Sequence, residues 1–132
     1  MNTKIKNIES IIYPDLSYDI VGAAFSVFNS IGFGMNEKFY QEAFAKELEK
    51  QGKQYQRERM IEVKYKDNFV KKFFLDFIVD EKIVVELKVK PRFGYVHIRQ
   101  VLEYLKASQY QLALIVYFTK DGVKYKRILN AS

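Results

Sequence analysis

The 132-residue sequence predicts a single α/β (α+β) domain with a mixed central β-sheet flanked by helices. Apolar residues first recur at helical spacing and then alternate with charged residues at a period of two. After one more helical segment, residues 112–118 are continuously apolar, as expected for a central strand covered on both faces. The expected order is α-α-β-β-β-α-β-β within one domain over residues 1–132, with residues 1–14 as a lead-in segment.

Three helices are expected. The first begins near Asp15 or Ser17, which are both plausible N-caps, and ends at the glycines of residues 32–34. The second spans about residues 36–51 and stops at Gly52. The third follows a break at residues 91–94 and spans about 95–108. Its expected core face consists of Ile98, Val101, Leu102 and Leu105.

Five strands are expected. The first alternates through Ile61, Val63 and Tyr65, and the second follows a turn at residues 67–68 and ends near Val79. Residues 80–82 turn into a third strand over about 83–89. The fourth strand is the apolar run, and the lysine-rich segment 123–129 has the character of an edge strand.

The composition restricts the possible chemistry. The chain has no cysteine, which excludes disulfides, thiol catalysis and zinc–thiolate sites, and its one histidine, His97, excludes a histidine-rich metal site. A bound metal would therefore have oxygen ligands, which favours magnesium, manganese or calcium. The net charge of +6 is compatible with a polyanionic partner.

The sequence contains no segment typical of a signal peptide or of a membrane span. Cytoplasmic location without membrane association is therefore the default expectation.

Three charged residues interrupt two apolar strands. Asp76 lies within the apolar run 73–79, and Glu86 and Lys88 lie within the run 83–89. Charged residues are depleted in strands and costly to bury. Their placement is therefore the strongest indication of a functional site in this chain.

The hairpin between these strands decides whether the three residues can meet. Glu86 and Lys88 are two residues apart and project from the same face of their strand. If residues 80–82 form a three-residue loop, Val79 pairs with Ile83 and Asp76 lies opposite Glu86. A two-residue loop would place Asp76 opposite Val85, on the wrong face.

Opposed carboxylates repel each other, and a cation between them makes the arrangement favourable. Two carboxylates, waters and a substrate phosphate are the usual ligands of magnesium in proteins. Lys88 could then orient or deprotonate an attacking water and offset phosphate charge. The alternative is that Glu86 and Lys88 form a solvated strand face and that Asp76 is incidental.

Further segments carry a resemblance to a known family. Residues 34–40 read Gly-x-x-Glu-x-x-Tyr and follow the helical segment 20–32, and the segment 97–107 begins His-Ile-Arg-Gln. Together with the strands that carry Asp76, Glu86 and Lys88, the chain resembles the GxxExxY family of the PD-(D/E)XK nuclease superfamily over roughly residues 16–128. It departs from the family pattern at Phe33, where a proline is usual, and at Leu75, where a proline often precedes the aspartate.

The resemblance implies a restriction-endonuclease-like core and specific residue roles. It implies that Asp76 and Glu86 bind the metal, Mg²⁺ or Mn²⁺, and that Lys88 is catalytic. It also implies that Glu37 is an additional metal-binding acid and that Gln100 lies beside the active site. An acid in the first turn of a helix is also favoured by the helix dipole alone.

Three further residues are weaker candidates. Tyr40 belongs to the family motif, although a core position explains it better than a catalytic role. His97, Gln100 and Tyr104 share one face of the third helix, distinct from the predicted core face, and could contact phosphate or a metal-bound water if that helix packs beside the site.

The leading hypothesis is a magnesium-dependent nuclease that hydrolyses nucleic acid, with DNA the expected substrate. Seven basic residues could track phosphates, although they form no compact run: Lys64, Lys66, Lys71, Lys72, Lys90, Arg92 and Arg99. The alternatives are a non-catalytic nucleic-acid-binding module and a partner-binding protein, such as a homodimer formed through an edge strand. With no separate recognition domain, low sequence specificity or a partner that supplies specificity is expected.

Overall fold

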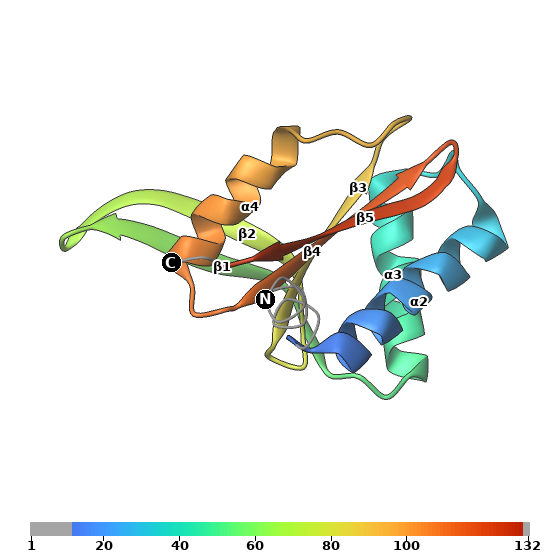
Figure 1. The fold of residues 1–132 in the computed structure, drawn as a ribbon, viewed down its shortest axis with the longest axis horizontal. Helices are drawn as coiled ribbons and strands as arrows, with labels where there is room; N and C mark the ends of the chain where they lie inside the picture. The colour runs from blue at the N-terminus through green and yellow to red at the C-terminus, as the bar shows by residue number, and fades with distance from the viewer. Residues whose placement is uncertain (1–11, 131–132) are drawn as a thin grey trace, which may run out of the picture.

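The computed structural model describes residues 12–130 (Figure 1). In chain order the elements are α2 (Pro14–Ile31), α3 (Glu37–Lys50), β1 (Tyr55–Tyr65), β2 (Asn68–Val79), β3 (Ile83–Val89), α4 (Val96–Ala107), β4 (Leu112–Thr119) and β5 (Gly122–Leu129). The predicted order of two helices, three strands, a helix and two strands is confirmed. Within the described residues, no helix has the length and apolar character needed to cross a membrane.

The start of α2 differs from the prediction. Pro14 is the first helical residue, where its missing N–H would have no partner within the helix. Ser17 does not cap the helix but is buried, and its hydroxyl accepts a hydrogen bond of 2.7 Å from Arg127 of β5. Asp15 lies in the first turn, so both predicted N-caps are wrong. Of the predicted lead-in, residues 1–11 lie outside the described part of the chain.

The five strands form one mixed sheet in the order β1-β2-β3-β4-β5. Strands β3 and β4 are parallel and are connected through α4, whereas the other neighbouring pairs are antiparallel. Every residue of β4 is buried, as its continuous apolar run predicts, and β5 is an edge strand as expected. Strand β1, the other edge, begins at Tyr55, well before the alternation of apolar residues becomes visible in the sequence.

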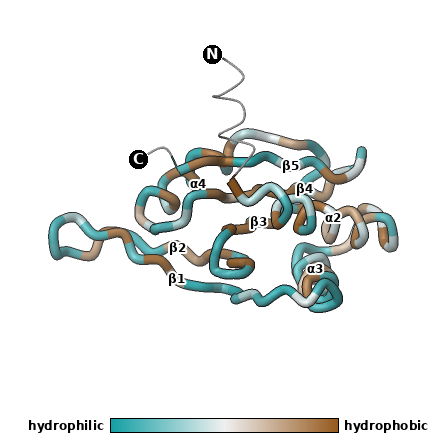
Figure 2. The backbone as a smooth tube through the Cα atoms, turned by 60° about the horizontal axis from the view of Figure 1, so that its bottom comes forward, coloured by the Kyte–Doolittle hydropathy of each residue, from teal (hydrophilic) through white to brown (hydrophobic). Residues whose placement is uncertain are grey.

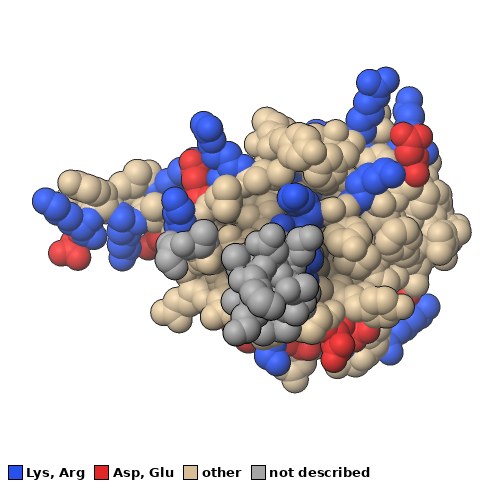
Figure 3. Space-filling model, in the orientation of Figure 1, with Lys and Arg blue, Asp and Glu red and all other residues tan. Residues whose placement is uncertain are grey.

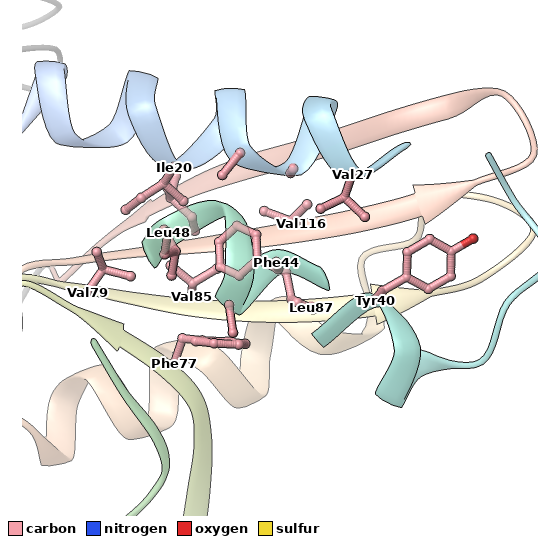
Figure 4. Packing of buried hydrophobic residues seen from close by; sticks show 14 of the residues in the cluster. Ile20, Val27, Tyr40, Phe44, Leu48, Phe77, Val79, Val85, Leu87 and Val116 are labelled. Carbon is pink, nitrogen blue, oxygen red and sulfur yellow. The ribbon is translucent and has the colours of Figure 1, made fainter. Parts of the chain in front are cut away.

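Helices cover both faces of the sheet. Helices α2 and α3 pack on one face, where Phe44 and Leu48 contact the odd-numbered residues of β3 (Figure 4). Helix α4 packs on the other face through Val101, Tyr104 and Leu105, against a second apolar cluster that includes Val84. Because side chains alternate along β3, Glu86 and Lys88 project toward the α4 side. The site is therefore built on the face that α4 covers.

Tyr40 anchors the connection between α2 and α3. Its side chain is fully buried, its ring stacks on Phe118 at 4.5 Å, and its hydroxyl donates a hydrogen bond to the carbonyl oxygen of Gly32. Gly32 has a φ of 65°, which glycine adopts without strain. These contacts give the tyrosine of the motif a structural role, because they tie the start of α3 to the end of α2 and to β4.

Replacing Tyr40 with phenylalanine should lower the free energy of unfolding by about 1–2 kcal/mol, because the hydrogen bonds of the hydroxyl with Gly32 O and Met35 N–H are lost while the stacked ring remains. Urea denaturation measures this change, and Tyr18→Phe is the control because Tyr18 is 80% exposed. If Tyr40 has only this structural role, the cleavage activity that the family resemblance implies stays unchanged at a temperature where both proteins are folded. A selective loss of activity in Tyr40→Phe would contradict the structural assignment.

Strands β1 and β2 extend beyond the body of the molecule as a two-stranded projection (Figures 1 and 2). We call residues 60–74 the hairpin arm. The side that faces α4 contributes Ile61, Val63 and Phe73 to the α4 cluster. The register shifts by one residue between Val63 and Lys64, close to the tip.

Candidate active site

The hairpin between β2 and β3 has the register that a shared site requires. Val79 pairs with Ile83, Ile78 with Val84 and Phe77 with Val85, which confirms the predicted three-residue loop at residues 80–82. Continuing this register places Asp76 opposite Glu86. The paired ladder ends at Phe77 and Val85, so the two acids lie where β2 and β3 begin to separate.

The regular pleat of β2 is interrupted at Asp76. Phe73 and Leu75 belong to the cluster on the α4 side, whereas Phe77 and Val79 belong to the cluster on the α2 and α3 side. A regular strand would place these odd-numbered residues on a single face. The interruption explains how a carboxylate can occur within an apolar strand without entering either apolar layer.

Strand β1 is irregular at the same level. The pairs Arg57–Phe77 and Arg59–Leu75 flank Glu58, which is unpaired and has a φ of 54°. A left-handed conformation is uncommon for a residue other than glycine. Sequence reasoning missed this feature, because neither glycine nor a turn motif marks position 58.

The two acids bind the backbone that their strands leave unpaired. Leu87 N–H donates to Asp76 Oδ2 at 2.9 Å, and Asp76 N–H donates to Glu86 Oε1 at 3.3 Å. Each carboxylate thus takes the place of a backbone hydrogen bond between β2 and β3 where the two strands begin to separate. These reciprocal bonds hold the two carboxyl groups side by side.

Glu86 is only 4% exposed, whereas Asp76 is partly exposed. Burial, the charge of Asp76 and a hydrogen bond between the two carboxyl groups raise the pKa of Glu86 to about 9, against the opposing effect of Lys88. In the protein alone, Glu86 is therefore protonated at neutral pH. The pair can take up one proton or, in its place, a cation.

Lys88 lies near both Glu86 and His97. Its positive charge opposes the rise in the pKa of Glu86. The pKa of His97 is lowered mainly by burial and also by the charge of Lys88. Lys88 makes no ion pair with any residue of the described range 12–130. Its ammonium group therefore places a positive charge near the two acids without forming an ion pair with either of them.

Helix α4 covers the site with a tyrosine. Tyr104 is 4% exposed, its ring packs against Phe73 at 5.1 Å, and its pKa is raised by burial and then by the charge of Glu86 and a hydrogen bond with it. The prediction that Tyr104 lies apart from the core face is wrong, because Tyr104 is part of the buried face of α4 together with Val101 and Leu105. His97 lies two turns before Tyr104 and is partly buried, whereas Gln100, between them, is exposed.

A family model described as the PD-(D/E)XK nuclease superfamily matches residues 14–128, which cover the described elements from α2 to β5 except the last residue of β5. The chain belongs to the PD-(D/E)XK nuclease superfamily. No curated protein matches this chain significantly.

A solved structure agrees with the PD-(D/E)XK fold. The crystal structure of SSO0001 superposes with a TM-score of 0.57 at 20% sequence identity. The match covers 70% of this chain and 48% of the SSO0001 chain, so this chain corresponds to about half of that protein. At this level of identity the likeness establishes the fold.

Not every predicted residue of the PD-(D/E)XK site comes together. Within residues 12–130, no three or more acidic, histidine or cysteine side chains are grouped so that they could hold a metal ion. Glu37 is exposed in the first turn of α3, on the opposite side of the sheet from α4, and it does not complete a three-acid cluster with Asp76 and Glu86. The structure thus assembles the two strand acids, Lys88 and Tyr104, while Glu37 and Gln100 lie at the periphery.

Proposed function

We propose that this chain is a metal-dependent nuclease that hydrolyses phosphodiester bonds of nucleic acid, with DNA as the expected substrate. The observation that carries the proposal is the Asp76–Glu86 pair, held by reciprocal hydrogen bonds where β2 and β3 separate. Lys88 adds a positive charge on the same face as Glu86. Membership in the PD-(D/E)XK nuclease superfamily supports the same chemistry.

The residues present suit a divalent cation such as Mg²⁺ or Mn²⁺. A buried carboxyl with a pKa raised to about 9 beside a second carboxyl is electrostatically unfavourable when both are ionised. Asp76 and Glu86 would hold the ion, and waters and a substrate phosphate would complete its ligands. The ion supplies Lewis-acid polarisation of the phosphoryl group when it is bound.

Three side chains would assist the two acids. The Lys88 ammonium would donate hydrogen bonds to a phosphate oxygen and orient the attacking water. His97 would act as a neutral side chain at neutral pH, because burial and the charges of Lys88 and Lys90 lower its pKa. Gln100 lies one turn after His97 on α4 and would contact the substrate or a metal-bound water.

We further propose that the chain belongs to the GxxExxY group and that Glu37 joins the site when metal and substrate bind. Tyr40, one turn after Glu37, stacks on Phe118, and Phe118 pairs with Val89, the neighbour of Lys88. The start of α3 therefore lies at the same end of the sheet as Lys88. A side-chain movement of Glu37 toward that end would bring a third carboxylate to the metal.

The proposed function is tested by incubating the purified protein with labelled DNA and, separately, with RNA of the same sequence. Cleavage is expected with Mg²⁺ or Mn²⁺, and none in excess EDTA. Salt-sensitive binding of nucleic acid without cleavage in any metal would instead support a non-catalytic binding module. Cleavage that is insensitive to EDTA would exclude the proposed metal chemistry.

Removing the Tyr104 hydroxyl should weaken metal binding. In Tyr104→Phe, Glu86 loses the partner that orients it, and groups that orient metal ligands are typically worth 10- to 100-fold in metal affinity or activity. The Mg²⁺ concentration for half-maximal cleavage should therefore rise by roughly 10- to 100-fold. Tyr95→Phe is the control because Tyr95 is 72% exposed, and an equal response of the two variants would exclude a role of Tyr104 at the site.

A further inference from the structure

The hairpin arm carries several large hydrophobic side chains that are exposed to solvent. Its large exposed hydrophobic side chains are Met60, Tyr65, Phe69, Val70 and Phe74. Phe74 is 64% exposed and Phe69 is 55% exposed, although both lie within a strand. A clustered set of exposed aromatic side chains typically marks an interaction surface.

The register gathers three of these residues, Met60, Phe69 and Phe74, on one face of the arm. Met60 pairs with Phe74, Glu62 with Lys72 and Lys64 with Phe69, and all alternate with residues that face α4. Helices α2 and α3 pack against the body of the sheet and do not bury this face, as the exposure of Phe69 and Phe74 demonstrates. The arm therefore presents an aromatic and basic surface with no cover among the described residues.

The lysines of the arm are interleaved with its rings. Lys72 Nζ lies 5.6 Å from the centre of the Phe69 ring, and Lys66 Nζ lies 5.5 Å from that of Tyr65. Neither of these two lysines has an ion pair within residues 12–130, whereas Lys64 Nζ lies 3.8 Å from the carboxylate of Glu62 in an exposed pair. Figure 3 shows lysine and arginine side chains gathered along the arm, at the left of the view.

We infer that this face of the hairpin arm binds an unpaired stretch of nucleic acid, with bases stacked on Phe69 and Phe74 and phosphates bound by Lys64 and Lys72. The inference rests on the proposed function, and it adds both the binding surface and the single-stranded character of the ligand. Aromatic side chains beside positive charge are the combination that binds single strands, because every base has a face that can stack. Bases within a duplex are already stacked on each other and cannot use this surface.

The arm continues into the strand that carries Asp76, but its aromatic face is opposite to the face that α4 covers, toward which Glu86 and Lys88 project. A nucleic-acid strand bound to the arm therefore has to pass the edge of the sheet to reach the acids. Strand β2 runs from the arm directly into Asp76, two residues after Phe74 and seven after Phe69. At about 3.4 Å per residue, the two rings lie about 7 Å and about 24 Å along the strand from the proposed metal ligand. A second copy of this chain fits the surface less well, because the protein is strongly basic and would bring like charges together.

The test is fluorescence anisotropy with a labelled 20-nucleotide DNA strand and with the matching duplex, in EDTA so that no cleavage occurs. The double variant Phe69→Ala, Phe74→Ala should bind the single strand at least about tenfold more weakly and the duplex nearly unchanged. The matched control is Tyr18→Ala, Tyr125→Ala, which removes two exposed aromatic rings from the body of the protein. Circular dichroism verifies that all proteins are folded.

Salt dependence tests the lysines separately. The double variant Lys64→Ala, Lys72→Ala should reduce the slope of log K against log salt for the single strand by about 1.4, since each lost phosphate contact contributes about 0.7. The control is Lys120→Ala, Lys124→Ala, which removes one lysine from the β4–β5 turn and one from the start of β5. An unchanged slope in the arm variant would overturn the assignment of these lysines.

The remaining outcomes separate this inference from the proposed function. If the protein binds the single strand through the arm but cleaves nothing in Mg²⁺, the inference about the arm stands and the proposed nuclease function is wrong. If the protein cleaves nucleic acid but the Phe69→Ala, Phe74→Ala variant binds the single strand as tightly as wild type, the proposed function stands and the inference about the arm is wrong. Loss of a dimer in that variant by sedimentation, with strand binding intact, would identify the arm as a self-association surface and overturn the inference.

Discussion

Replacing Asp76 with asparagine is expected to lower the rate of metal-dependent cleavage at least about a thousandfold. Asparagine keeps the size of the side chain and an oxygen that can accept the hydrogen bond from Leu87 N–H. It removes the negative charge that a divalent cation requires. Metal assistance is worth several kcal/mol, and each 1.36 kcal/mol corresponds to tenfold in rate.

The matched control for this variant is Asp80→Asn. Asp80 also accepts a backbone hydrogen bond, from Gln54 N–H at 3.0 Å, but it lies in the hairpin loop away from the site. Its φ of 52° is a conformation that asparagine tolerates well. Equal cleavage by wild type, Asp76→Asn and Asp80→Asn in single-turnover assays would mean that the activity comes from another site or from a contaminant.

A parallel comparison isolates Lys88. Lys88→Ala should reduce cleavage about a hundredfold to a thousandfold, the usual effect of removing one charge-stabilising donor at the reacting group. Lys90→Ala removes an exposed lysine from the same segment and should retain most of the activity. A loss shared equally by both variants would indicate a general electrostatic contribution to binding.

The second large effect concerns stability as a function of pH. In the metal-free folded protein the pKa of Glu86 is raised to about 9 from an ordinary value of 4.5. The folded state therefore retains a proton that the unfolded state releases above about pH 4.5. The stabilisation from this proton is fully present below that pH, and it is lost as the pH rises toward 9. The loss amounts to several kcal/mol across this range.

Thermal unfolding in EDTA from pH 5 to pH 9 measures this effect. The melting temperature of the wild type should fall as the pH rises, and Mg²⁺ at pH 8 should raise it again by replacing the proton. Glu86→Gln carries no titrating group at this position and should have a nearly flat pH dependence with no response to Mg²⁺. The same slope and the same metal response in both proteins would contradict the assignment of the pair.

Much of the framework follows from patterns that are local in the sequence. The order of elements, the buried β4 and the odd-length loop at residues 80–82 depend on periodicity and turn residues, which act over short distances. The opposition of Asp76 and Glu86 follows from that loop by counting. The three strand residues of the candidate site were therefore predictable together.

The features that escaped prediction depend on contacts between distant segments. The change of face at Asp76 is matched by the left-handed Glu58 on the neighbouring strand, and neither position carries a sequence signal. Tyr104 is buried because Phe73, on the arm, packs against it from another element. Ser17 accepts a hydrogen bond from Arg127 at the far end of the chain rather than capping its own helix.

The most direct test of the central claim is a crystal of the wild-type protein soaked in Mn²⁺, with an anomalous difference map calculated at the manganese absorption edge. A peak is predicted between the Asp76 and Glu86 carboxylates, within coordinating distance of an oxygen of each. The same soak of Asp76→Asn should show no peak there. Wild-type crystals with no peak between the two acids, or with manganese bound only elsewhere, would contradict the account.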